Sequence, residues 1–232
     1  YKYQEALRIR RELENQSAVA ETLESIGSVY RQQERSPAAA GVLREALRVN
    51  REIGDRASAA QDLNELATLY RDRDSTERAV GLYREALRIN RELGRSADVA
   101  ATLAGLGRTH LAADRYAAAD SVLREAIAIT ETLLETASGA HRRDYLATVI
   151  DRFHALVTVR VRADRPHAAL RVLERSRTRV LSEHLAEDER LGGAVPSYPS
   201  VDALQNALGP REAAVLYANS DDRLPLTVFV VT

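Results

Sequence analysis

Apolar residues along most of the chain recur at intervals of three and four, which is the spacing of one face of an α-helix. This pattern is itself repeated. The segments ALRIRREL, ALRVNREIG, ALRINRELG and AIAITETLL begin at Ala6, Ala46, Ala86 and Ala126, so successive copies are 40 residues apart. A period of this length predicts a stacked array of helix pairs, in which each unit buries its apolar face on the next.

Each unit contains two apolar stripes separated by a polar turn, as expected for two antiparallel helices. The recurring positions are Leu23, Ile26, Gly27, Tyr30, Ala39, Leu43 and Ala46 in the first full unit, Leu63, Leu66, Ala67, Tyr70, Ala79, Tyr83 and Ala86 in the second, and Leu103, Leu106, Gly107, His110, Ala119, Leu123 and Ala126 in the third. We expect the small residues where two helices cross, because a larger side chain would push the helices apart. The predicted fold class is all-α.

The order of large, small and aromatic positions resembles the tetratricopeptide repeat (TPR). The 40-residue length resembles the longer repeats of kinesin light chains, of spindle-orientation adaptors and of many bacterial signalling proteins. This resemblance implies a right-handed TPR superhelix of antiparallel helix pairs, with the first helix of each pair on the concave side. It also implies a protein or peptide partner in the concave groove.

The period and its interruptions predict the domain organisation. We expect a TPR array over residues 1–190, divided into a partial repeat over 1–19, repeats of period 40 from about 20 to 139, and a divergent capping pair over 140–190. Tyr3 and Ala6 match Tyr83 and Ala86 in phase, which predicts that the chain begins within the second helix of a preceding repeat. The glycines and prolines of residues 191–199 predict a linker.

Residues 200–232 differ in character from the array. Ser200 can cap a short helix, VDALQNAL, and the polar turn NSDDR separates two predicted strands, AAVLYA and LPLTVFVVT. The segment LTVFVVT is apolar on both faces, as in a strand that is covered on both sides. We therefore predict a small C-terminal α/β fragment, a short helix plus a β-hairpin, that belongs to a larger sheet.

Residues 169–232 resemble the junction between TPR repeats and the CHAT domain, a caspase- and separase-like peptidase fold. The residues that carry the resemblance are ALRVLERSRTRVLSEHLA, VDALQNALG and the closing LTVFVVT. The resemblance implies that residues 200–232 are the truncated N-terminal piece of a CHAT-like domain, whose catalytic His and Cys lie farther downstream. The parent would be a bacterial TPR-CHAT cysteine peptidase, with its own downstream CHAT domain as one partner of the array. The alternatives are a TPR module of a different bacterial signalling regulator without peptidase activity, and a scaffold with no regulated partner.

Composition narrows the functions available to the chain itself. The 33 basic and 34 acidic residues nearly balance, so no net field favours nucleic acid or an anionic membrane surface. The absence of cysteine excludes disulfides, a cysteine-ligated metal and a cysteine nucleophile within this chain. The five histidines lack the spacing of a zinc-binding helix, and no Ser-His-Asp arrangement is recognisable. We therefore expect no catalytic residue, no metal and no cofactor in this chain. We also expect a cytoplasmic location, since no apolar run reaches the roughly 18 residues of a membrane span.

Polar positions beside the packing stripe of each first helix are the candidate partner-binding residues. These positions on the implied concave face are Glu21, Ser25, Ser28, Arg31, Asn64, Glu65, Thr68, Arg71 and Arg108. Arg31 and Arg71 are 40 residues apart, and stacked guanidinium groups could clamp a carboxylate, with which each pairs bidentately. The sequence leaves open an alternative in which these residues form only a solvated helix face.

Overall fold

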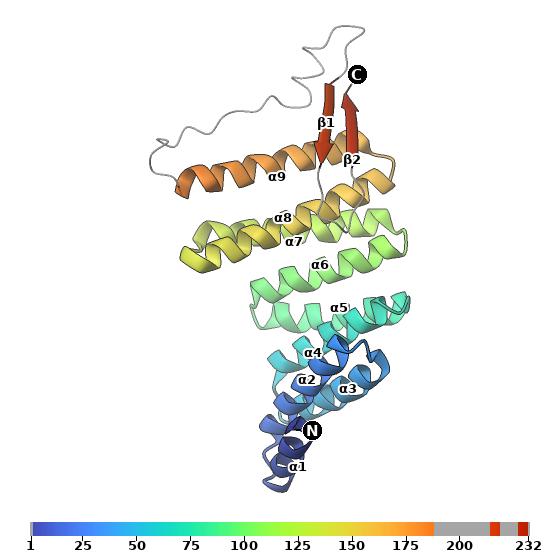
Figure 1. The fold of residues 1–232 in the computed structure, drawn as a ribbon, viewed down its shortest axis with the longest axis vertical. Helices are drawn as coiled ribbons and strands as arrows, with labels where there is room; N and C mark the ends of the chain where they lie inside the picture. Colours follow the sequence, from blue (N-terminus) through green and yellow to red (C-terminus); the bar gives the residue numbers. More distant parts are fainter. Residues whose placement is uncertain (1, 188–213, 219–226, 232) are drawn as a thin grey trace. The chain divides into compact units, whose positions relative to one another are not determined.

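The predicted helices are present along the described part of the chain. The computed structural model describes residues 2–187, 214–218 and 227–231, and nine helices and two strands are assigned among them (Figure 1). They are α1 (Lys2–Glu12), α2 (Gln16–Gln32), α3 (Ser36–Glu52), α4 (Arg56–Arg71), α5 (Thr76–Glu92), α6 (Ser96–Ala112), α7 (Tyr116–Thr136), α8 (Gly139–Arg162), α9 (Pro166–Glu187), β1 (Ala214–Ala218) and β2 (Thr227–Val231). The all-helical character predicted for the array is confirmed.

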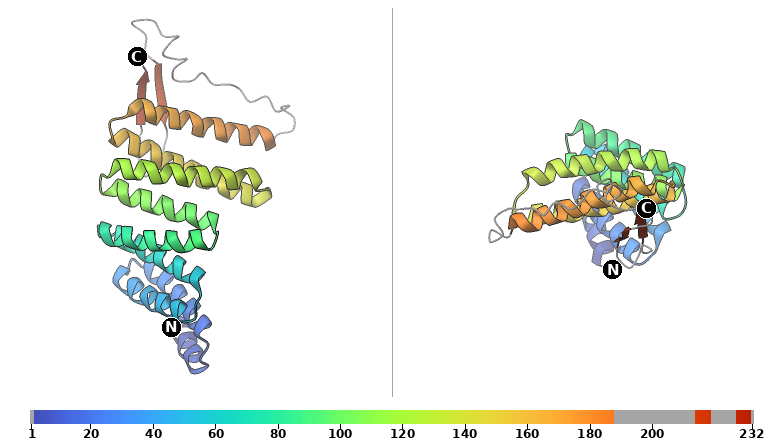
Figure 2. Two further views of the ribbon diagram at one scale, coloured as in Figure 1. Left: turned by 180° about the vertical axis from the view of Figure 1, so that it is seen from behind. Right: turned by 90° about the horizontal axis from the view of Figure 1, so that it is seen from above.

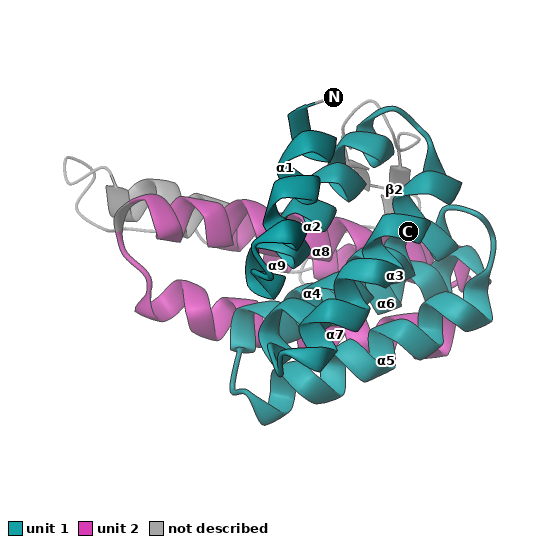
Figure 3. Cartoon of the chain, turned by 90° about the horizontal axis from the view of Figure 1, so that it is seen from below, with its two compact units in different colours: residues 1–114 teal, residues 115–232 magenta. Residues whose placement is uncertain are grey.

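The chain divides into two compact units, Tyr1–Asp114 and Arg115–Thr232 (Figure 3). In the first unit each helix packs against the next one in the chain, from α1 to α6, as the views in Figure 2 also show. The helices α2 and α3 form one pair and α4 and α5 form the next, while α3 and α5 also contact the first helix of the following pair, α4 and α6 respectively. Each helix pair therefore buries its apolar face against a neighbouring pair.

The turns between helices depend on residues with left-handed backbone conformations. Gly54 and Gly94 have φ angles of 75° and 68° and follow the ends of α3 and α5. The Gly54 N–H donates to the carbonyl of Arg51, and the Asp55 N–H donates to that of Asn50 at 2.8 Å. These two bonds form a Schellman motif, which satisfies carbonyls that the helix end leaves unpaired.

The start of α3 differs by one residue from the simplest sequence expectation. Ser36 followed by Pro37 suggests that Ser36 is the N-cap. In the structure Ser36 is the first helical residue and Arg35 is the N-cap, without a side-chain capping hydrogen bond. The side chains of Asn15 and Asp55 do cap their helices, since they accept from the backbone N–H groups of Ala18 and Ser58.

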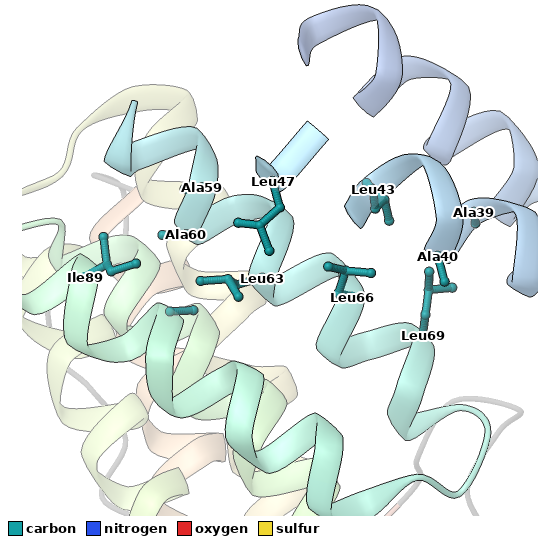
Figure 4. Close-up of a cluster of buried hydrophobic side chains, with 11 residues drawn as sticks. Ala39, Ala40, Leu43, Leu47, Ala59, Ala60, Leu63, Leu66, Leu69 and Ile89 are labelled. Atoms are coloured by element: carbon teal, nitrogen blue, oxygen red, sulfur yellow. The ribbon is translucent and has the colours of Figure 1, made fainter. Parts of the chain in front are cut away.

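The core of the first unit is built from the predicted apolar stripes. One cluster joins α3, α4 and α5 (Figure 4); its members are Ala39, Ala40, Leu43, Leu47, Ala59, Ala60, Leu63, Leu66, Leu69, Ala86 and Ile89. Burying each leucine contributes roughly 1.5 to 3 kcal/mol. The small residues have a steric role, because a Cβ atom on Gly27 would lie 3.0 Å from Leu43 on α3. Gly27 therefore permits the close approach of α2 and α3.

The second unit contains α7, α8 and α9, which pack in chain order. The core of this unit includes Phe153, Leu156 and Val157 on α8, which are buried. Arg160 on α8 donates to the carboxylate of Asp120 on α7 at 2.7 Å. This ion pair joins two helices inside the unit.

The strands β1 and β2 pair in antiparallel orientation, with Leu216 opposite Phe229. The expected short helix over 201–208, the linker over 191–199 and the hairpin turn lie outside the described residues. The C-terminal α/β fragment as a whole therefore stays a prediction, as do the domain boundaries given above.

Candidate protein-interaction face

The nine candidate residues lie on α2, α4 and α6, the first helices of the pairs in unit 1. We call the side of these helices that carries them the first-helix face. Glu21 and Arg31 are exposed, and Ser25, Ser28, Asn64, Glu65, Thr68, Arg71 and Arg108 are partly exposed. All nine thus lie outside the fully buried core, as a contact surface requires.

Several of these side chains already bind neighbouring groups within the chain. Asn64 donates from Nδ2 to Thr102 Oγ1 on α6 at 3.0 Å. The Thr68 hydroxyl donates to the carbonyl of Asn64 and lies 2.8 Å from the hydroxyl of Tyr83. These contacts fix the relative positions of α4, α5 and α6.

The two arginines suggested as a carboxylate clamp differ in their surroundings. Arg31 has no ion-pair partner among the described residues. Arg71 donates from Nε and Nη2 to Asp72 Oδ1, at 3.0 and 2.8 Å. A partner carboxylate would therefore replace Asp72, and an ion pair near the surface costs little to exchange. The joint action of the two arginines stays a hypothesis.

A buried polar bridge that sequence reasoning missed joins α2, α3 and α4. Asn50 donates from Nδ2 to Glu24 Oε1 at 3.1 Å and to Asp62 Oδ2 at 2.8 Å. Asn50 is 2% exposed and Asp62 is 1% exposed. The available signal was the period, because Asn50 and Asn90 are 40 residues apart and interrupt the apolar stripes at the same position.

Burial and neighbouring charge alter the titration of this bridge. Burial raises the pKa of Asp62 to about 7; the hydrogen bond from Asn50 opposes this rise, and the carboxylates of Glu24 and Glu65 add to it. Burial also raises the pKa of Glu24 above its ordinary value. The carboxyl groups of Glu24, Asp62 and Glu65 therefore interact with one another at this part of the first-helix face.

At α6 the face lacks carboxylates at these positions. The positions that correspond to Glu24 and Glu65 in the period are Ala104 and Gly105. A Cβ atom on Gly105 would lie 2.7 Å from the ring of Tyr83, which is 2% exposed. Gly105 thus makes room for the aromatic ring of Tyr83 on α5. The carboxylates at these positions are those of Glu24 on α2 and Glu65 on α4.

No metal or membrane site emerges in the described part of the chain. Among these residues, no group of three or more His, Cys, Asp or Glu side chains could hold a metal ion. His110 is buried in the position that Tyr30 and Tyr70 take in the other repeats. None of the described helices combines the length and apolar character that crossing a bilayer requires.

Comparisons with known proteins identify the repeats. Two tetratricopeptide repeat family models match, one over residues 22–57 and the other over residues 57–132. No curated protein sequence matches the chain.

Solved structures share the fold. BtubC (BKLC) from P. vanneervenii is 23% identical, with 94% of this chain and 78% of that chain covered and a TM-score of 0.69. A putative kinesin light chain from Podosopora anserina is 17% identical, with 78% and 85% covered and a TM-score of 0.61. A Rap protein complexed with Competence and Sporulation Factor is 16% identical, with 82% and 55% covered and a TM-score of 0.60. The helix pairs, the period and the two family models agree that residues 22–132 are tetratricopeptide repeats.

Proposed function

We propose that the chain is a protein-interaction array that binds a protein or peptide on the first-helix face. The observation that carries the proposal is a set of polar side chains outside the core that recurs with the 40-residue period: Ser25 and Glu65, Ser28 and Thr68, and Arg31 and Arg71. The structure of a Rap protein complexed with Competence and Sporulation Factor supports a binding role for this kind of fold. A helical repeat array offers such a surface without any catalytic group.

Charge reversal tests this face. Peptides that bind the chain are first selected from a random peptide display library, and their affinities are measured by calorimetry. We expect Arg31→Glu combined with Arg71→Glu to weaken the selected peptides at least tenfold, because guanidinium groups at the face would pair with acceptors of the partner. The melting temperature should stay unchanged, since neither side chain belongs to the core.

The matched control is Arg44→Glu combined with Arg84→Glu. These two exposed arginines are also 40 residues apart, but they lie on the second helices α3 and α5. The control should leave affinity unchanged. Equal affinities for wild type and the Arg31/Arg71 double variant would reject the proposed site.

For the parent protein, we propose a bacterial, cytoplasmic TPR-CHAT protein in which the array senses a partner and a downstream CHAT domain has cysteine peptidase activity. The resemblance of residues 169–232 to the TPR-CHAT junction supports this proposal. In the proposal, this chain supplies the interaction array and the first elements of the peptidase-like domain, and it is not itself catalytic.

A second candidate is a TPR module of a different bacterial signalling regulator, which the fold shared with the Rap protein favours. Sequencing the gene beyond the codon for residue 232 separates the two candidates. A His followed by a Cys at successive strand ends is expected for the CHAT protein. A nucleotide-binding loop there would contradict it and support the signalling regulator.

A further inference from the structure

The first-helix face contains three carboxylates that lie close together. We call Glu24, Asp62 and Glu65 the acidic cluster. Asp62 and Glu65 are three residues apart on α4 and therefore lie on one side of that helix. Glu24 on α2 joins them through Asn50, whose amide donates to both Glu24 and Asp62. Glu24 and Glu65 are partly exposed and Asp62 is 1% exposed, so two carboxylates are within reach of a partner and the third lies behind them.

Two buried oxygens of the cluster have no hydrogen-bond donor in the part of the chain that the structure describes. They are Oδ1 of Asp62 and Oε2 of Glu65. A buried acceptor without a donor costs about 1 to 3 kcal/mol, and buried polar groups in folded proteins are nearly always paired. The carboxylate oxygens of the cluster therefore outnumber the donors that the chain supplies to them.

The preceding repeat shows how a guanidinium group fits an equivalent place. Arg10 precedes Asn50 by 40 residues, and Thr22 precedes Asp62 by the same interval. Arg10 donates from Nη1 to Thr22 Oγ1 at 2.7 Å and to the carbonyl of Ala18 at 2.8 Å. In the next repeat the shorter Asn50 replaces the arginine, and an acid replaces the threonine.

The following repeat lacks the acidic cluster. Asn90 donates to Thr102, a neutral residue, and the positions equivalent to Glu24 and Glu65 are Asn64 and Gly105. The equivalent positions of the following repeat thus lack the three acids. Helix pairs of this array can therefore pack without them.

We propose that the acidic cluster binds the guanidinium group of an arginine side chain of the protein or peptide partner. This inference rests on the proposed function of the first-helix face and specifies the chemistry of its partner. Guanidinium carries five N–H donors in a planar fork and remains charged at all relevant pH values, whereas lysine has three donors on a strongly hydrated point charge. It would supply donors to Glu24 and Glu65, and its charge would offset the repulsion among the three carboxylates.

The test is an NMR titration of the full chain at pH 8 with N-acetyl-arginine amide, and separately with N-acetyl-citrulline amide. Citrulline has nearly the same shape without the charge. We expect arginine to cause saturable shifts of the backbone amides of Glu24, Asn50 and Asp62 to Glu65, and citrulline to bind at least tenfold more weakly. N-acetyl-lysine amide should bind less tightly than the arginine compound, because it lacks the planar fork.

A pair of carboxamide variants identifies the residues responsible. Glu24→Gln combined with Glu65→Gln should weaken arginine binding at least tenfold, with an unchanged circular dichroism spectrum. The control, Glu34→Gln combined with Glu135→Gln, removes the same charge from two exposed residues that do not belong to the cluster and should leave the binding unchanged.

Two results would overturn the proposal. One is equal binding of the arginine and citrulline compounds, and the other is equal arginine binding by the Glu24/Glu65 variant and wild type. Either result leaves the interaction face itself open to its own test, because library-selected peptides that lose affinity with the Arg31/Arg71 variant would still support that face.

Discussion

Asp62 is the residue at which burial and charge are most strongly opposed. It is 1% exposed and accepts one hydrogen bond, from Asn50, while Glu24 and Glu65 lie near it. In the folded chain burial raises its pKa to about 7 from an ordinary value of 3.8. Between these values the folded state retains a proton that the unfolded state has lost. The contribution of Asp62 to stability therefore decreases as pH rises from about 4 to 7.

Asp62→Asn changes the free energy of unfolding, and we expect this change to be more favourable at pH 8 than at pH 5 by roughly 1 to 3 kcal/mol. One pKa unit corresponds to about 1.4 kcal/mol. Asparagine resembles the protonated acid and carries no charge. Urea denaturation of wild type and variant at both pH values measures the difference. The control is Asp74→Asn at an exposed turn. An equal effect of Asp62→Asn at the two pH values would contradict the burial argument.

Single residues with left-handed backbone conformations also determine the turns between helices, and only some of these residues can be recognised from the sequence. Glycine at positions 54 and 94 was a readable signal for a left-handed helix end. The equivalent position in the preceding repeat is Glu14, which has a φ of 55°. The turns that follow the first helices use Glu34 and Asp74, with φ angles of 58° and 55°. An acidic residue in the sequence does not predict a left-handed backbone conformation, because most acidic residues in proteins have negative φ angles.

At the scale of the helices, the distance between two neighbouring helices depends on where a glycine replaces a larger residue. Tyr83 on α5 lies between α4, where its hydroxyl contacts Thr68, and α6, where its ring contacts Gly105. Gly81 lies on the same helix, and a Cβ atom there would have no atom within 4 Å. The two glycines therefore have different roles, one in packing and the other at an open surface.

We expect Gly105→Ala to lower the free energy of unfolding by roughly 1 to 3 kcal/mol, because the added methyl group would force Tyr83 to move. Gly81→Ala should instead raise it by up to about 1 kcal/mol, since alanine favours the helix more than glycine does. Chemical denaturation of both variants measures the two effects. Stabilisation by Gly105→Ala would show that α5 and α6 separate easily and would contradict the packing role.

At the scale of the whole molecule, each repeat of the array contacts only its neighbours. A core substitution in one repeat should therefore destabilise mainly that repeat and its neighbours. Leu63 is fully buried in the cluster that joins α3, α4 and α5. We expect Leu63→Ala, which should cost about 2 to 5 kcal/mol, to reduce protection from amide hydrogen exchange most strongly in these three helices. The reduction in α8 and α9 should be smaller, as mass spectrometry of the exchanged chain would show.

The exposed residue Leu13 provides the control for this experiment. It is 72% exposed, so Leu13→Ala should leave exchange nearly unchanged. An equal loss of protection in all helices after Leu63→Ala would mean that the chain unfolds as one cooperative unit, and would contradict the local picture.

The sequence by itself determined the helices, their 40-residue period and most of the core, because helical spacing and small residues such as Ala39 and Gly27 are local signals that recur in every repeat. It also placed the nine candidate contact residues on first helices. Their surroundings required the tertiary structure. The bridge from Asn50 to Glu24 and Asp62 joins three helices, and its charges interact only after the helix pairs stack. Burial and hydrogen-bond partners are properties of that stacking, so no single segment of the sequence contains them.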